Sequence, residues 1–238
     1  MVPPSPSATD HPAGSSPYEA TGHGRRERRK EARPGELLDA ALELFVQKGY
    51  AATRAEEVAH LAGVSKGTLF LYFSTKEELF KAVVRENLSG RFEEWNAEFE
   101  RFEGSTADML RYGMRSWWER IGSTRASGIT KLMMSEARNF PELAEFFQHE
   151  VIRPGHELIR RILQRGVDRG EFTVPHIGYA TYGVLAPMMY LALWQHSLGC
   201  CAGAAELVPQ DYIAAQSELL LAGLGARAPA PPASTVHP

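Results

Sequence analysis

Apolar residues recur every three or four positions along most of this chain, and that spacing predicts amphipathic helices. In residues 34–48 the apolar stripe falls on Leu37, Ala41, Leu44 and Phe45. Pro34 suits the first turn of this helix, and Gly49 suits its C-terminal cap. No segment has a convincing strand pattern. We therefore expect an all-α fold.

The stretch Thr53–Phe73, with the sequence TRAEEVAHLAGVSKGTLFLYF, predicts two short helices joined by a tight turn. Ala59 lets the helices approach, Gly63 allows the positive φ of the turn, and Leu69 packs the second helix on the first. The other inward positions at helical spacing are Val58, Leu61 and Val64. This arrangement is a helix-turn-helix.

Polar residues mark where the helices begin. Thr53 stands three residues before Glu56, which predicts a capping box, and Ser65 can cap the second helix. Ser74 or Thr75 could cap a fourth helix. That helix should run through Arg85 toward about residue 102 and act as a lever to the rest of the chain.

The string AGVSKGTLFLYFSTKEEL, with the helix before it, resembles the TetR family of bacterial transcriptional regulators from Pro34 to about Val84. The resemblance implies that the second helix lies in the DNA major groove. It also implies that Lys76 and Tyr72 hold phosphates. Many relatives carry Tyr at the position of Phe70, where Phe leaves only apolar contact with a thymine methyl group. We expect DNA contacts from Thr53, Ser65, Lys66, Gly67, Thr68, Phe70, Tyr72 and Lys76.

Further helices are expected at about 106–121, 127–139, 141–169, 176–198 and 209–223, which makes about nine in all. Pro154–Gly155 should kink or split the helix at 141–169. The expected division is a disordered segment 1–33 that ends in a basic arm, a helix-turn-helix domain 34–84, a ligand-binding and dimerisation domain 85–225, and a disordered tail 226–238.

The charge distribution favours local contact with DNA. The chain of 238 residues has a net charge of −3, which excludes a general polyanion binder. Residues 25–33, RRERRKEAR, hold six basic and two acidic side chains. This run is either a solvated tail or an arm that reaches phosphates or the minor groove.

The adjacent cysteines Cys200 and Cys201 predict no disulfide framework, which fits a reducing cytoplasm, and no signal peptide is recognisable. Residues 172–205 contain no Asp, Glu, Lys or Arg. Gly183, Pro187 and His196 argue against a membrane span there, so we expect a buried helix. In the resembled family the last two helices form a four-helix bundle with a second subunit, which implies a homodimer.

Met and aromatic residues gather in the middle of the chain and suggest an adaptable apolar pocket between helices 106–121, 127–139 and 141–169. The resemblance implies a small effector, and SEARNFPELAEFFQHEV resembles AefR-like members. Candidate ligand contacts are Trp117, Trp118, Met133, Met134, Glu136, Phe147 and Tyr182.

These features predict a DNA-binding regulator, a repressor that a small apolar effector releases by altering the spacing of the recognition helices. The alternative is an effector-independent repressor. An enzyme or a metal-binding helical protein is a weaker hypothesis, since it rests only on Glu145 with His149 and on His196 near the cysteines. We expect no cofactor, no metal and no catalytic residue.

Overall fold

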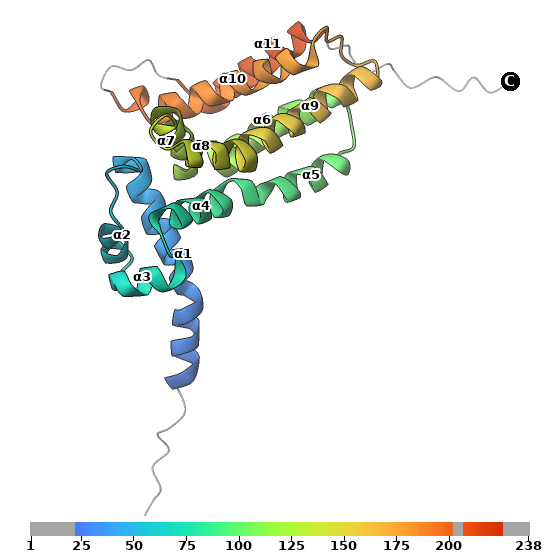
Figure 1. The fold of residues 1–238 in the computed structure, drawn as a ribbon. Helices are drawn as coiled ribbons and strands as arrows, with labels where there is room; N and C mark the ends of the chain where they lie inside the picture. The colour runs from blue at the N-terminus through green and yellow to red at the C-terminus, as the bar shows by residue number, and fades with distance from the viewer. Residues whose placement is uncertain (1–21, 202–206, 226–238) are drawn as a thin grey trace, which may run out of the picture.

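The computed structural model describes residues 22–201 and 207–225, and all regular structure in them is helical. The all-α expectation is therefore confirmed. Helices α1–α3 form one end of the molecule, while α10 and α11 lie side by side along the opposite edge (Figure 1). The expected disorder in residues 1–21 and 226–238 lies outside the described residues.

The helices of the N-terminal half are α1 Gly22–Lys48, α2 Ala55–Leu61, α3 Lys66–Tyr72, α4 Lys76–Asn87 and α5 Phe92–Glu100. Those of the C-terminal half are α6 Thr106–Trp117, α7 Gly128–Glu136, α8 Pro141–Phe147, α9 Arg153–Asp168, α10 Ile177–Gln195 and α11 Pro209–Gly223. The last of these matches the expected helix 209–223 at both ends.

Helix α1 begins at Gly22, so it starts before the predicted position at Pro34 and includes residues 25–33. The basic run consists of Arg, Glu, Lys and Ala, which are all strong helix formers. Pro34 lies inside the helix, where it removes one backbone hydrogen bond. Gly49 ends the helix with a φ of 85°, as predicted.

Helix α2 begins one residue later than the predicted capping box. The backbone N–H of Arg54 donates to the carboxylate of Glu57 at 3.2 Å, so Thr53 is not the cap. The Thr53 side chain is buried, and its hydroxyl donates to the carbonyl oxygens of Leu44 at 3.2 Å and Gly49 at 2.7 Å. Thr53 therefore fixes the end of α1 from inside.

The core of the helix-turn-helix follows the prediction at Val58, Ala59 and Leu69, which are all buried, and Gly63 has a φ of 68°. The inward prediction for Leu61 is wrong, since 48% of its surface is exposed. At 100° per residue, Leu61 lies roughly 110° around α2 from the direction that Val58 and Ala59 share.

The predicted long fourth helix is broken. A single 3₁₀ turn, Ser89–Arg91, separates α4 from α5. A Cβ atom at Gly90 would lie 2.8 Å from the carbonyl oxygen of Arg85, so this bend requires glycine. The expected helix 141–169 is also split, by a π-helical turn at Gln148–Ile152 just before Pro154, as the Pro154–Gly155 pair predicted.

One apolar cluster joins the helix-turn-helix to the helices that follow it. It contains Phe45 and Phe80 from the N-terminal part together with Leu132, Met133 and Phe147 from α7 and α8. A second cluster is formed by α6, α9, α10 and α11 around Met109, Leu163 and Leu191. Residues on both sides of the predicted boundary at 84 and 85 therefore share the first cluster.

Candidate nucleic-acid interface and effector groove

Helix α3 is fixed to the body of the helix-turn-helix at its start and along one face. The hydroxyl of Ser65 accepts a hydrogen bond from the backbone N–H of Thr68 at 3.1 Å, which is the predicted N-cap. Leu69 is fully buried beneath the helix. The direction of the opposite face is thus set by the core.

That opposite face is exposed and carries most of the predicted DNA contacts. Ser65, Lys66, Gly67, Phe70 and Tyr72 are exposed, and Thr68 is partly so. Leu71 is 84% exposed, although sequence reasoning did not select it. Leu71 is two positions after the inward Leu69, which places it about 200° around the helix. Its position relative to Leu69 therefore predicts that it faces outward.

Lys66 makes contacts within the helix-turn-helix that a phosphate could replace. Its ammonium pairs with the carboxylate of Glu56 on α2 and lies 5.7 Å from the centre of the Phe70 ring. Both members of the ion pair are 55% exposed. Exposed pairs of this kind contribute little to stability, so Lys66 can exchange its partner at small cost.

Lys76 has an internal role that differs from the predicted phosphate contact. Its ammonium donates to the carbonyl oxygens of Tyr50 at 2.9 Å and Thr53 at 3.1 Å. Partial burial lowers the pKa of Lys76. These carbonyls follow α1 and have no helical partner, which explains why the cation turns inward.

Glu136, a predicted pocket residue, makes its hydrogen bonds outside any pocket described above. Its carboxylate accepts the backbone N–H groups of Tyr50 at 2.9 Å and Ala51 at 3.0 Å. Both residues belong to the connection between α1 and α2. Glu136 therefore contacts the DNA-binding end of the molecule.

The other predicted ligand contacts are divided between the packed interior and the surface. Trp118, Met133 and Phe147 are buried in packing, and Met133 and Phe147 share the cluster that includes the helix-turn-helix. Met134 is 65% exposed and Tyr182 is 59% exposed. Trp117 is half-buried against both apolar clusters. Ligand binding by these residues stays a prediction.

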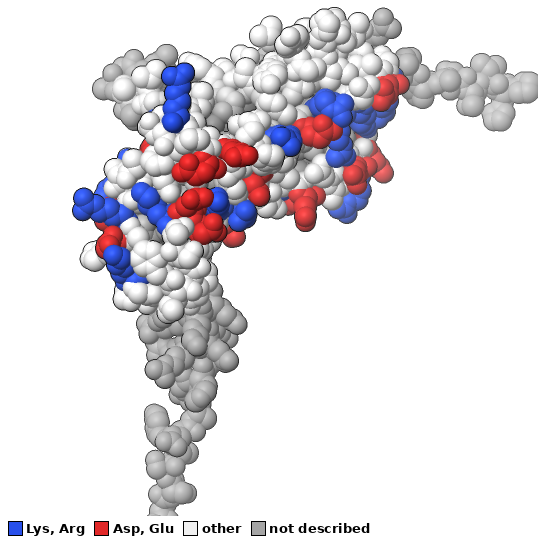
Figure 2. Space-filling view, viewed as in Figure 1, with Lys and Arg blue, Asp and Glu red and all other residues white. Residues whose placement is uncertain are grey.

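A groove of about 410 Å³ lies instead between α5, α6 and α9. Its apolar lining comes from Phe99, Met109, Leu158 and Ile162. Its charged lining comes from Arg160, Arg161, Arg165 and Arg169 together with Glu100 and Asp168. Figure 2 shows basic side chains, with acidic ones among them, over this part of the surface. Two of the three helices predicted to line a pocket border it, and α7 does not.

The four arginines of this groove differ in their hydrogen bonds and in their exposure. Arg165 donates to the carbonyl oxygen of Gly104 and the hydroxyl of Thr106, both at 3.0 Å, and burial lowers its pKa. Arg169 also donates to Gly104, at 3.1 Å. Arg160 and Arg161 are nearly half exposed, and their carboxylate partners are exposed as well. The latter two can turn toward an anion in the groove.

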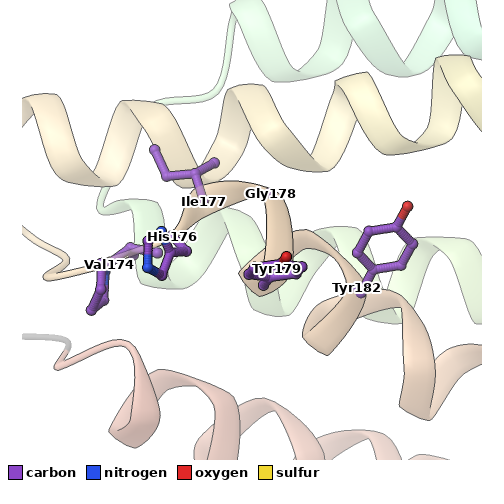
Figure 3. Close-up of a pocket in the computed structure, with 7 residues that line it drawn as sticks. Val174, His176, Ile177, Gly178, Tyr179 and Tyr182 are labelled. Carbon is purple, nitrogen blue, oxygen red and sulfur yellow. The ribbon is translucent and has the colours of Figure 1, made fainter.

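The outer face of α10 is a stripe without charged side chains. It exposes Gly178, Tyr179, Tyr182, Gly183 and Tyr190 at helical spacing. A hollow of about 490 Å³ lies at its start, beside the rings of Tyr179 and Tyr182 (Figure 3). Leu219 of the adjacent α11 is 67% exposed. A continuous apolar surface of this kind is typical of a protein interface.

Two further features of the described residues bear on the remaining hypotheses. Across residues 22–201 and 207–225, no three His, Cys, Asp or Glu side chains are grouped as a metal site would require. In the same residues, no helix combines the length and hydropathy needed to cross a membrane.

Both halves of the chain match families of known proteins. Residues 37–83 match the family described as bacterial regulatory proteins, tetR family, and residues 103–199 match the tetracyclin repressor-like C-terminal domain. The HTH-type transcriptional regulator RutR of Escherichia coli (strain K12) is 29% identical over 168 residues, which cover 69% of this chain and 70% of RutR. The uncharacterized HTH-type transcriptional regulator YfiR of Bacillus subtilis is 28% identical over 148 residues, which cover 60% of this chain and 69% of YfiR.

Among solved structures, FadR of Bacillus subtilis in complex with stearoyl-CoA has the same fold, with a TM-score of 0.67 and 19% identity. The match covers 79% of this chain and 98% of FadR. The similar proteins are transcriptional regulators rather than enzymes. An AefR-like subtype stays a prediction. With both of its domains matched, the chain belongs to the TetR family of bacterial transcriptional regulators.

Proposed function

We propose that this regulator binds a palindromic operator as a homodimer and that it is a repressor, released by a small effector. The observation that carries the proposal is the exposed face of α3. Buried Leu69 and the Ser65 cap fix the direction of this face, and Lys66, Phe70 and Leu71 project from it. Basic and apolar side chains on such a face suit phosphates and thymine methyl groups.

A dimer supplies the second α3 that a palindrome requires. The stripe of α10, with Leu219 of α11, offers small residues for close approach and tyrosines for burial. Two copies related by a two-fold axis would present their α3 helices to half-sites roughly 34 Å apart. Any change in the angle between the copies would alter this spacing.

The groove between α5, α6 and α9 is the proposed effector site. An apolar lining with four arginines against the two carboxylates of Glu100 and Asp168 fits an anionic amphiphile, such as a fatty acyl-CoA thioester. The stearoyl-CoA bound to FadR of Bacillus subtilis, which shares this fold, supports the same class of ligand. The effector releases the operator if it binds more tightly to the conformation with the wrong α3 spacing.

The experiment is the selection of bound sequences from random duplex DNA by the full chain. An enriched palindrome is expected. Lys66→Ala and Leu71→Ala should weaken binding to it, whereas Arg125→Ala should not. Arg125 is a suitable control because it forms an exposed ion pair with Glu43, away from α3. Selection of no sequence by folded protein would overturn the proposal.

The effector is tested on the selected operator with stearoyl-CoA, stearate and coenzyme A as separate probes. We expect stearoyl-CoA alone to release the DNA. The double variant Arg160→Ala, Arg161→Ala should require more of it. Arg125→Ala is again the matched control. Release by none of the three probes would favour the effector-independent repressor.

A further inference from the structure

The connection between α1 and α2 is held on two sides. On one side, the Glu136 carboxylate accepts the N–H groups of Tyr50 at 2.9 Å and Ala51 at 3.0 Å. On the other side, the Lys76 ammonium binds the carbonyl oxygen of Tyr50. Glu136 follows Tyr50 by 86 positions and belongs to α7, outside the helix-turn-helix. This is a direct polar contact between the two parts of the molecule.

The turn is shaped to admit this carboxylate. A Cβ atom at Gly49 would overlap Oε1 of Glu136. Gly49 also has a φ of 85°, which disfavours other residues. Next to the carboxylate, the ring of Phe140 packs against that of Tyr50 at 4.7 Å. The segment from Glu136 to Phe140 thus contacts both the backbone and the side chain of Tyr50.

Helix α7 connects this contact to the opposite edge of the molecule. It packs against α1 on one side and α10 on the other. Lys131, one turn before Glu136, donates to the carbonyl oxygen of His196 at the end of α10. Helix α7 therefore links the end of α10 to the turn before α2, with a polar contact from Lys131 to the former and from Glu136 to the latter.

We propose that Glu136 is a positioning residue for operator recognition, which sets the orientation of the helix-turn-helix relative to the ligand-binding part. The inference rests on the proposed function, since it assigns to Glu136 the coupling between α10 and α3. A carboxylate that accepts two adjacent backbone N–H groups fixes both the position and the direction of the turn. Release of this contact lets the two α3 helices of a dimer lose their common spacing.

The test compares Glu136→Gln with Glu142→Gln in the full chain. Glu142 is exposed on α8; after burial and Glu77, its charge also raises the pKa of Tyr50, and within residues 22–201 and 207–225 it accepts no backbone hydrogen bond in that turn. The first measurement is hydrogen exchange at the amides of Tyr50 and Ala51. We expect exchange at least about tenfold faster in Glu136→Gln and unchanged in the control.

The second measurement is affinity for the selected operator as a function of salt. Glu136→Gln should bind about tenfold more weakly, with the salt dependence of the wild type because no phosphate contact is lost. Thermal unfolding of each variant separates this effect from loss of fold, and Glu136→Asp replaces Glu136→Gln if the latter does not fold.

Equal operator affinity in Glu136→Gln and Glu142→Gln would overturn the inference while the proposed function stands. Unchanged exchange at Tyr50 and Ala51 in Glu136→Gln would overturn it as well. Failure of the wild type to select any DNA sequence would overturn the proposed function, and with it the role assigned to Glu136.

Discussion

The ammonium of Lys76 lies 4.4 Å from the centre of the Tyr50 ring and 2.9 Å from the carbonyl oxygen of the same residue. Tyr50 in turn packs against Phe45 and Phe80 in the core. A cation that opens the first turn of α4 thus stabilises the end of α1. Backbone carbonyl oxygens of one turn therefore hold the Lys76 ammonium inside the protein.

Lys76→Met should therefore act on stability. Backbone carbonyls left without a donor cost about 1–3 kcal/mol of unfolding free energy, measurable by urea denaturation. The slope of operator affinity against salt should stay that of the wild type, whereas Lys66→Ala should reduce it by about 1. A reduced slope with intact stability in Lys76→Met would restore Lys76 as a phosphate contact.

Leu71→Ala should weaken operator binding and leave stability nearly unchanged. The side chain is 84% exposed, so its loss should change the unfolding free energy by no more than about 0.5 kcal/mol. Operator affinity should fall about tenfold, because an apolar base contact is removed. Met134→Ala, which truncates another exposed apolar side chain, is the control and should bind normally. Equal affinity of the two variants would exclude Leu71 from the interface.

Substitutions at Gly63 and Gly49 distinguish the stability cost of backbone strain from the cost of losing the Glu136 contact. Gly63 has a φ of 68° and no heavy atom within 4 Å of an added Cβ, so Gly63→Ala should cost about 1 kcal/mol. Gly49→Ala carries similar strain and also displaces the Glu136 carboxylate, so it should cost about 1–3 kcal/mol more. Equal losses in thermal unfolding would show that the turn does not depend on Glu136.

The free energy of unfolding should fall in mild acid because of His196. Burial and the neighbouring Lys131 lower the pKa of His196, whose ring lies 2.7 Å from the hydroxyl of Ser127. The unfolded chain then takes up this proton first, near the ordinary value of about 6.5, so stability falls as the pH drops below it. Unfolding at pH 5–7.5 should show a smaller fall in His196→Gln than in the exposed control His149→Gln. Identical pH profiles would contradict this.

The α10 stripe predicts the oligomeric state. Gly183→Arg places a charge on an exposed surface where an added Cβ meets no heavy atom within 4 Å, so the monomer should fold normally. Sedimentation should show a dimer in the wild type and a monomer in this variant. Met134→Arg, on α7, should remain dimeric. A dimeric Gly183→Arg would place the interface elsewhere.

The sequence predicts best the features that depend on neighbouring residues. Ala59, Gly63 and Leu69 define the helix-turn-helix within about 20 positions, and Thr75 indeed caps α4. The break between α4 and α5 was missed because the apolar period continues through it. Only the close approach of Gly90 to the Arg85 carbonyl shows why the helix bends there.

Roles that depend on distant contacts could not be predicted in this way. The Met and aromatic residues near Glu136 in the sequence predict a pocket contact, yet its hydrogen-bond partners lie more than 80 positions away. Lys76 follows a family pattern, but three backbone carbonyls from one turn determine its position. Such polar contacts become visible only when the turn and the two helices are placed together.

The shared apolar cluster limits how this protein can be re-engineered. Phe45 and Phe80 pack in one core with Met133 and Phe147, and Tyr50 is covered by Phe140. A graft of residues 34–84 onto a foreign sensor would strip this cover and leave aromatic rings in water. A functional chimera must therefore include α7 and α8 together with the helix-turn-helix domain, although residues 85–127 lie between them along the chain.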